Sequence, residues 1–218
     1  NDTNNNLKQQ INNAWKKENL QRNKILLGLK NAKDDDIIMI SDVDEIPDLI
    51  NINFKNIKEK IIMFQQSMFY YKFDLKIPDL LWTGTKACKK KYFFSPQWLR
   101  NVKDKKYFPF RIDILFSEKK YSSIKFISNG GWHFSNIKTA EEIEHKLKSY
   151  LHHREFDEQS LSVEEIQNII ENKKAIYDLN VDKRVNKIGD GSKLVKIKFE
   201  KLPIYIQQNK HNYMKWLD

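Results

Sequence analysis

The stretch Asp34–Pro47, which reads Asp-Asp-Asp-Ile-Ile-Met-Ile-Ser-Asp-Val-Asp-Glu-Ile-Pro, constrains the fold of this chain more than any other. A short apolar run of mostly β-branched residues after an acidic turn predicts a strand at residues 37–40 that is buried on both faces. Pro47 then ends the regular structure, because it has no backbone N–H to donate. We therefore expect the sequence Asp-x-Asp-Glu to lie at the end of a core strand.

The two aspartates after this strand indicate a divalent metal site. Side chains alternate along an extended backbone, so we expect Asp42 and Asp44 to point to the same side. Two carboxylates that converge at a buried strand end repel each other and are costly to desolvate. A cation between them removes both costs, and carboxylate oxygens favour Mg²⁺ or Mn²⁺, which also bind substrate phosphates. The alternative is a solvated acidic turn after a core strand.

Composition predicts one large domain with an anionic partner. Only 6 of the 218 residues are Gly and 5 are Pro, so no flexible linker divides the chain. We expect a single domain over residues 1–218, with the polar residues 1–6 frayed. The net charge of +10 indicates a nucleotide diphosphate, an acidic glycan, a membrane surface or a nucleic acid as partner. The alternative is a Lys-, Asn- and Ile-rich composition without a binding face.

The cysteine content and hydropathy bear on the cellular location. The single Cys88 excludes an intrachain disulfide and suits a reducing compartment. No run approaches the roughly 18 apolar residues of a membrane span, and the first residues are too polar for a signal peptide. We expect a cytoplasmic protein without a transmembrane segment. A Golgi-lumenal or virus-encoded protein is the alternative, if an anchor segment lies outside this sequence.

A helical pattern over residues 7–33 places Glu18 and Arg22 four residues apart, hence on one face. The pair is either an exposed ion pair or part of a face from which Arg22 reaches a phosphate.

A second informative stretch, Gly130–Ser135, reads Gly-Gly-Trp-His-Phe-Ser. Paired glycines allow a positive φ or a close approach of the backbone to a ligand. His133 is either a core residue between two aromatic neighbours or an imidazole ligand that joins Asp42 and Asp44 on the metal.

Two helices are expected after this stretch, because Thr139 and Ser162 are each followed by glutamate at capping-box spacing. Lys146 on the first helix either reaches a phosphate or is solvated. His153 and Glu155 near its end are candidate acid–base groups, and the alternative is a polar helix terminus.

These stretches together resemble glycosyltransferase family 17, which includes the enzyme that adds the bisecting N-acetylglucosamine to N-glycans and many bacterial and viral relatives. The resemblance covers about residues 15–215, and its most specific part is the pair Asp-x-Asp-Glu-Ile-Pro and Gly-Gly-Trp-His-Phe-Ser. The matching pieces are Glu18 with Gln21-Arg22-Asn23, the run 36–47, Pro96 with Leu99-Arg100, the run 130–135, Lys146 with Ser149, His153 and Glu155, and the run 202–206.

The resemblance implies an α/β fold of glycosyltransferase A type, a Rossmann-like α/β/α sandwich around a largely parallel sheet. Family members usually carry further strands and helices before the helix of Glu18, so part of the N-terminal nucleotide-binding segment is expected to be absent. The implied reaction is inverting and metal-dependent: a sugar, N-acetylglucosamine by the resemblance, moves from a UDP-sugar donor to a hydroxyl of a glycan acceptor. The metal neutralises the leaving diphosphate, and a base deprotonates the acceptor.

The resemblance also implies roles for single residues. The metal, Mn²⁺ or Mg²⁺, is assigned to Asp42 and Asp44, with His133 as a further ligand. The candidate catalytic bases are Glu45 and Glu155. The donor-binding set is Arg22, Asp42, Trp132, Lys146 and His153. No nucleic acid is expected as a partner of such an enzyme.

Other functions remain open at this point. A haloacid-dehalogenase-like phosphohydrolase would use Asp42 as nucleophile together with Asp44, but it favours Thr or Val where Ile46 stands. Its late acidic motif would have to be the run 189–191, which no strong apolar strand precedes. A two-metal nuclease is a further enzyme class. A non-catalytic glycan- or nucleic-acid-binding protein would use exposed tryptophans for stacking, and the candidates are Trp82, Trp98 and Trp132.

Overall fold

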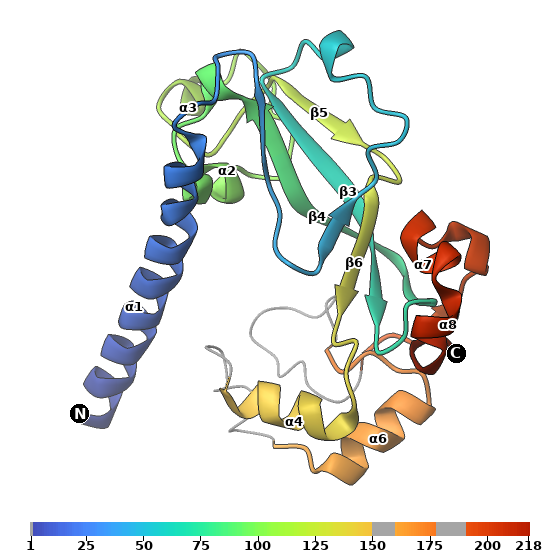
Figure 1. The fold of residues 1–218 in the computed structure, drawn as a ribbon. Helices are drawn as coiled ribbons and strands as arrows, with labels where there is room; N and C mark the ends of the chain where they lie inside the picture. The colour runs from blue at the N-terminus through green and yellow to red at the C-terminus, as the bar shows by residue number, and fades with distance from the viewer. Residues whose placement is uncertain (1, 150–159, 178–190) are drawn as a thin grey trace. The chain divides into compact units, whose positions relative to one another are not determined.

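The computed structural model describes residues 2–149, 160–177 and 191–218. The chain forms two compact units, and each is built from two chain segments. Unit 1 comprises residues 1–66 and 83–131, and unit 2 comprises residues 67–82 and 132–218. The prediction of one domain over the whole chain stays a prediction. Figure 1 shows the helices and strands of both units.

Unit 1 begins with a long helix. Helix α1 (Asp2–Asn23) continues as the 3₁₀ helix η1 (Lys24–Leu29) and packs against α2 (Pro96–Asn101). The helix therefore starts at Asp2. The prediction that residues 1–6 are frayed stays a prediction. Helix α2 begins directly after Ser95, which caps it by accepting a hydrogen bond from the Trp98 N–H.

The strands of unit 1 surround the predicted core strand. Strand β1 (Ile37–Ile40) pairs antiparallel with the end of β4 (Leu75–Lys89), and β3 (Ile61–Tyr70) pairs parallel with β5 (Ile124–Ile127). In β1 only the side chains of Ile38 and Ile40 are fully buried. The prediction of two fully buried faces is therefore wrong, although the other face is half-buried. Strand β4 continues through Gly84 without interruption.

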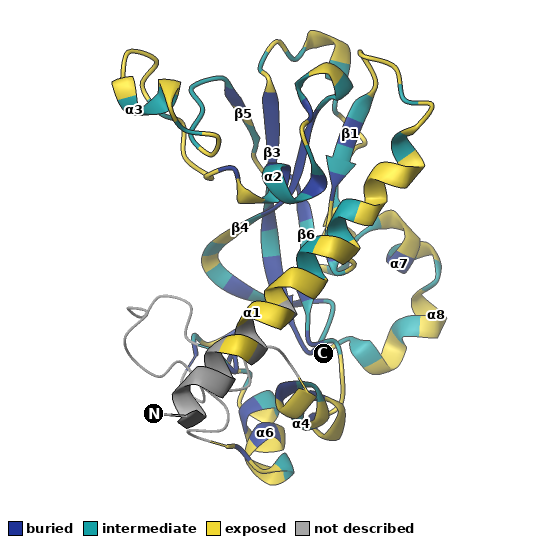
Figure 2. Cartoon of the chain, turned by 90° about the vertical axis from the view of Figure 1, so that its left-hand side faces the viewer, coloured by how far each residue is buried: buried dark blue, intermediate teal, exposed yellow. Residues whose placement is uncertain are grey.

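The core of unit 1 lies between these strands and α2. Figure 2 shows the strands mostly in the colour of buried residues. Cys88 lies within this core, where burial raises the pKa of its thiol to about 12. The thiol is therefore protonated and inert at neutral pH. The buried members of this cluster are Ile38, Ile40, Ile61, Met63, Cys88, Phe93, Leu99, Val102 and Ile124.

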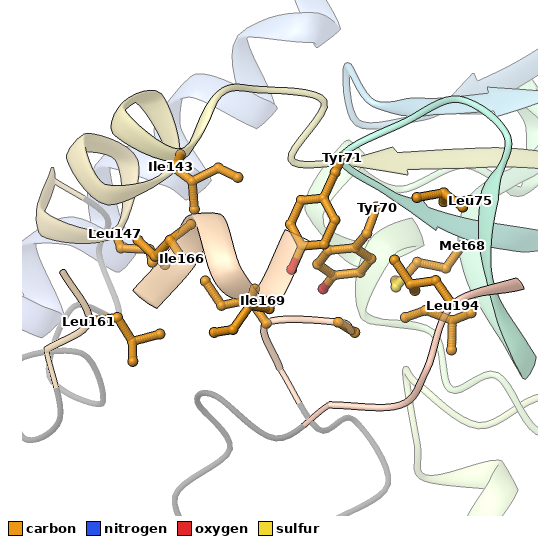
Figure 3. Close-up of a cluster of buried hydrophobic side chains, with 14 residues drawn as sticks. Met68, Tyr70, Tyr71, Leu75, Ile143, Leu147, Leu161, Ile166, Ile169 and Leu194 are labelled. Carbon is orange, nitrogen blue, oxygen red and sulfur yellow. The ribbon is translucent and has the colours of Figure 1, made fainter. Parts of the chain in front are cut away.

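Unit 2 contains the other ends of β3 and β4. Residues 67–70 of β3 pair parallel with β6 (Gly131–Ser135), and the start of β4 pairs antiparallel with β7 (Val195–Lys196). Helices α4 (Ala140–Ser149) and α6 (Val163–Glu171) pack on each other and carry the predicted capping boxes. Figure 3 shows their apolar faces meeting side chains of β3 and β4.

The sheet is mixed. Its strands follow the order β1-β4-β3-β6-β2, where β2 is Glu45–Pro47, with β5 added on β3 and β7 on β4. The parallel pairs involve β3, and antiparallel pairs join β4 to β1 and β7. The α/β class is confirmed, whereas the sheet is not largely parallel as predicted. The A-type α/β/α sandwich itself stays a prediction.

The remaining helical elements are short. None of the helices in the described part of the chain is both long and apolar enough to cross a membrane. The short elements are η2 (Phe54–Asn56), η3 (Lys90–Tyr92), α3 (Ile112–Leu115), η4 (Phe199–Lys201), α7 (Ile204–Gln208), α8 (Lys210–Tyr213) and η5 (Met214–Trp216).

Candidate functional site

The Asp-x-Asp-Glu stretch forms a tight turn rather than an extended segment. Strand β1 ends at Ile40, and the Glu45 N–H donates to the Asp42 carbonyl at 3.0 Å. Val43 lies in this turn and is fully exposed. The expected extended backbone, which would alternate the side chains of Asp42, Val43 and Asp44, is therefore wrong. The turn instead brings Asp42 close to Glu45.

Glu45 holds the turn from inside unit 1. Its side chain is only 1% exposed, and its Oε2 accepts a hydrogen bond of 2.9 Å from the Asp42 N–H. The Ser41 hydroxyl donates to the Glu45 carbonyl at 2.7 Å and lies 2.7 Å from the Thr85 hydroxyl of β4. Backbone and side-chain contacts of Glu45 therefore both fix the conformation of the turn.

Arg100 of α2 joins the two carboxylates. Its Nη2 donates to Asp42 Oδ2 at 2.7 Å, and its Nη1 donates to Glu45 Oε2 at 2.9 Å and to the Gly84 carbonyl. The planar guanidinium suits such shared recognition, because its donors are fixed in a fork. One largely buried cation thus offsets part of the combined negative charge of Asp42 and Glu45.

Arg22 approaches Asp42 from α1. Its Nη2 donates to Glu18 Oε1 at 2.9 Å and lies 3.5 Å from Asp42 Oδ1, and its Nη1 donates to Gln97 Oε1 at 2.6 Å. The predicted shared face of Glu18 and Arg22 is confirmed. The Asp42 carboxylate is therefore held by a different arginine at each oxygen, while its side chain remains 42% exposed. A phosphate contact of Arg22 stays a prediction.

Lys86 of β4 supports α2 from the core of unit 1. Lys86 is 5% exposed, and its Nζ donates to the carbonyls of Arg100 at 2.8 Å and Val102 at 2.6 Å. These carbonyls lie at the C-terminal end of α2, where no further helical turn can satisfy them. Burial, reinforced by the Arg100 charge, lowers the pKa of the Lys86 amine to about 8.

The paired glycines join the two most specific stretches of the sequence. The Asp48 N–H donates to the Gly130 carbonyl at 3.0 Å, directly after β2. Gly131 has φ +126°, and a Cβ there would lie 2.1 Å from the Ile46 carbonyl oxygen. The expected positive φ is confirmed at Gly131. The close approach is made to the backbone of the Asp-x-Asp-Glu-Ile-Pro stretch.

The residues at the turn suit a metal that takes further ligands from a substrate. In the described part of the chain, no three or more His, Cys, Asp or Glu side chains gather as a metal cage. Asp42 and Asp44 nevertheless supply carboxylate oxygens, and Asp42 is partly open to solvent. Magnesium is commonly bound by only one or two carboxylates together with substrate phosphates. The donor chemistry therefore fits Mg²⁺ or Mn²⁺ shared with a diphosphate.

The other candidate residues with described positions belong to unit 2. The Trp132 indole donates to the Lys201 carbonyl at 2.9 Å, and the Lys146 ammonium donates to Asn136 Oδ1 at 2.7 Å. His133 is 8% exposed, and its ring centroid lies 5.0 Å from that of Trp82. The ligand role of His133 toward Asp42 and Asp44 stays a prediction, because those residues belong to unit 1. His153 and Glu155 lie outside the described residues.

Sequence reasoning gave no role to three residues that shape the turn. Arg100 and Gln97 come from α2, and Thr85 comes from β4, all distant in sequence from Asp42. The signal that pointed toward Arg100 was its presence among the pieces of the family resemblance. Spacing offered no signal for Thr85, because a single hydroxyl in a strand is common.

Trp98 is a structural residue of unit 1 rather than a platform for stacking. Its indole donates to the Glu118 carbonyl at 2.8 Å, and its ring packs edge-on against Phe94 and Tyr121. This geometry removes one of the three tryptophans on which a glycan- or nucleic-acid-binding function would depend.

Comparison with known proteins supplies the remaining evidence. A search of curated proteins and a search of solved structures gave no significant match. The sequence model of glycosyltransferase family 17 matches residues 1–217, which is nearly the whole chain. The turn at Asp42, the glycine pair that contacts residues 46–48, and Arg100 all lie within the matched region. The chain therefore belongs to glycosyltransferase family 17.

Proposed function

We propose that this transferase is a metal-dependent, inverting enzyme that moves N-acetylglucosamine from UDP-N-acetylglucosamine to a hydroxyl of a glycan acceptor. The observation that carries the proposal is the Asp42–Glu45 turn in a chain of this family. Arg100 and Glu45 hold the turn from its buried side, and Asp42 remains 42% exposed. A fixed carboxylate with an open side is what a shared metal–diphosphate site needs.

The residues at the turn divide into those that would bind the metal and those that position a metal ligand. We assign Asp42 and Asp44 as the protein ligands of Mn²⁺ or Mg²⁺, which when bound neutralises charge on the leaving diphosphate. Arg22 and Arg100 orient the Asp42 carboxylate through its two oxygens. Such preorganisation matters because a small displacement of a binding group can cost a large factor in rate.

Glu45 is better suited to positioning than to proton transfer. Its carboxylate is 1% exposed and accepts hydrogen bonds from Arg100 and from the Asp42 N–H. A general base must reach the acceptor hydroxyl, and a buried, ion-paired carboxylate cannot do so without breaking these contacts. We therefore assign the base role to Glu155 among the two candidates.

The unit 2 residues complete the proposal. We assign Trp132 to stacking on the donor sugar, His133 to the metal, and Lys146 and His153 to the diphosphate. Lys146 already donates to Asn136, whose side-chain oxygen would hold the ammonium in place. The Trp132 indole N–H donates to the Lys201 carbonyl, and this contact restrains the ring. A ring held in this way loses little conformational entropy when a sugar stacks on it.

Thermal unfolding tests the proposed donor site. UDP and UDP-N-acetylglucosamine should raise the melting temperature in the presence of Mn²⁺, and the rise should disappear in Asp44→Ala. Asp35→Ala is the matched control, since Asp35 precedes the same strand and pairs with lysines at the surface. An equal rise in Asp44→Ala would refute the role of Asp44. Stabilisation by single-stranded nucleic acid and by no nucleotide would refute the proposed function.

A further inference from the structure

Unit 1 carries a loop whose large apolar side chains point into solvent. We call residues 108–116 the apolar loop, and it contains the short helix α3, which has no buried residue. Figure 2 shows α3, coloured partly as exposed and partly as intermediate, on a loop that extends away from the strands of unit 1. The exposed fractions are 66% for Phe108, 85% for Phe110, 74% for Ile112, 78% for Leu115 and 86% for Phe116.

The loop has an ordered base, so its exposed side chains are a feature of the fold. The Tyr107 N–H donates to the Tyr121 carbonyl at 3.1 Å, and the Arg111 N–H donates to the Phe108 carbonyl at 3.2 Å. Asp113 pairs with Arg111 at 2.9 Å and with Lys120 at 2.7 Å. Contiguous apolar side chains on a soluble surface usually mark a contact site.

Positive charge surrounds the apolar loop. Residues 103–120 contain six Lys or Arg and three Asp or Glu, and one of the acids, Asp113, is already paired. The Tyr107 ring has three cationic groups 5.7–5.9 Å from its centroid, those of Lys105, Arg111 and Lys120. The basic residues of this collar are Lys103, Lys105, Lys106, Arg111, Lys119 and Lys120.

We propose that the apolar loop docks unit 1 onto an anionic membrane surface. Aromatic and aliphatic side chains at the tip would enter the boundary between headgroups and acyl chains, and the basic collar would face the anionic headgroups. A second copy of the chain is a poorer occupant, because two identical collars would bring like charges together. Docking goes beyond sugar transfer and does not depend on the donor site.

Vesicle sedimentation tests the apolar part of the proposal. The full chain should pellet with vesicles of phosphatidylcholine and phosphatidylserine. The variant Phe108→Ser/Phe110→Ser/Phe116→Ser should partition at least about tenfold more weakly, because it loses three inserted rings. The control Ile204→Ser/Tyr205→Ser removes apolar side chains of unit 2 that are 51% and 65% exposed, and it should pellet like the wild type. Unchanged melting temperatures would show that all variants are folded.

A second comparison tests the charged part. The variant Lys105→Gln/Lys106→Gln should bind the same vesicles about fivefold more weakly for each lysine removed. Pure phosphatidylcholine vesicles should retain much less protein. The proposal is overturned if anionic vesicles retain no protein, if the triple serine variant pellets like the wild type, or if neutral vesicles bind equally well. It is also overturned if the triple variant abolishes a concentration-dependent dimer while vesicles bind nothing.

Discussion

Arg100 is the side chain on which the Asp42–Glu45 turn depends most. It contacts both carboxylates, and its own side chain is 14% exposed. A buried ion pair gives little net stability relative to an apolar pair, but the loss of one partner leaves the other charge buried and uncompensated. The turn is therefore expected to tolerate the loss of Arg100 poorly.

Arg100→Met should lower the free energy of unfolding by about 3 kcal/mol, because the Glu45 carboxylate would stay buried without its cation. Urea denaturation measures this change. Arg111→Met is the control, since Arg111 is 53% exposed and pairs with Asp113 at the surface. It should cost much less than Arg100→Met, because exposed ion pairs contribute little to stability. Equal losses of unfolding free energy in the two variants would contradict the conclusion that the turn depends on Arg100.

Lys86 should make stability depend on pH in the alkaline range. The pKa of its amine is lowered to about 8 in the folded chain from the ordinary value of 10.5. The unfolded chain therefore binds more protons between these values, and stability rises with pH there. Below about pH 8 both states are protonated, so the cost of burying the charge is fully present.

Relative to Lys86→Met, the wild type should gain about 2 kcal/mol of unfolding free energy between about pH 8 and about pH 10. Denaturation of both proteins at several pH values measures this difference, and tyrosine titration cancels because both proteins share it. Parallel pH profiles would mean that Lys86 keeps an ordinary pKa in the folded chain.

At Gly131, strand β6 approaches strand β2 too closely to leave room for a side chain. It begins β6, and the backbone of β2 occupies the place of its absent Cβ. Its φ of +126° is strained for every other residue type. The two strands can therefore approach this closely only because residue 131 is glycine, which has a hydrogen atom where other residues have Cβ.

Gly131→Ala should destabilise the chain by about 2 kcal/mol or more, from backbone strain and from displacement of β2. Gly28→Ala is the matched control, because a Cβ at Gly28 meets nothing within 4 Å in its 3₁₀ helix. That change should be neutral or slightly stabilising. Thermal unfolding of both variants distinguishes them, and a harmless Gly131→Ala would show that β2 and β6 do not approach in this way.

Features that depend on residues close together in the sequence could be predicted. Features fixed by contacts between residues far apart in the sequence could not. The caps of α4 and α6 lie within four residues of sequence, and both are confirmed. The conformation after β1 depends on Arg100, which is 58 residues from Asp42, so local alternation predicted the wrong geometry. Strand β4 likewise continues through Gly84, whose carbonyl accepts a hydrogen bond from Arg100, and no local pattern shows this contact.

The whole chain is organised in a way that its composition did not reveal. Each unit combines two segments that are separated in the sequence, and β3 and β4 each have residues in both units. The absence of a Gly- or Pro-rich linker predicts a single domain over residues 1–218, and this stays a prediction. The candidate residues are shared between the units, with Asp42 and Asp44 in unit 1 and Trp132, His133 and Lys146 in unit 2.

The basic residues that give the net charge of +10 include two groups with different surroundings. Arginines 22 and 100 are directed at carboxylates inside unit 1, whereas the lysines of the collar surround the apolar loop. A composition rich in Lys, Asn and Ile does not account for these two largely buried arginines, which contact Asp42 and Glu45. The charge therefore serves the structure of the turn and, by our proposal, a membrane surface.

Metal-dependent release of UDP from UDP-N-acetylglucosamine tests the central claim most directly. With Mn²⁺ the wild type should release UDP as the sugar passes to a glycan hydroxyl or, more slowly, to water. Chelation should stop the release, and Asp35→Asn should behave like the wild type. Asp44→Asn should lower the rate at least about 100-fold, since even the partners of metal ligands can cost as much. Release that is equal in Asp44→Asn and the wild type, or no release from any UDP-sugar, would contradict the claim.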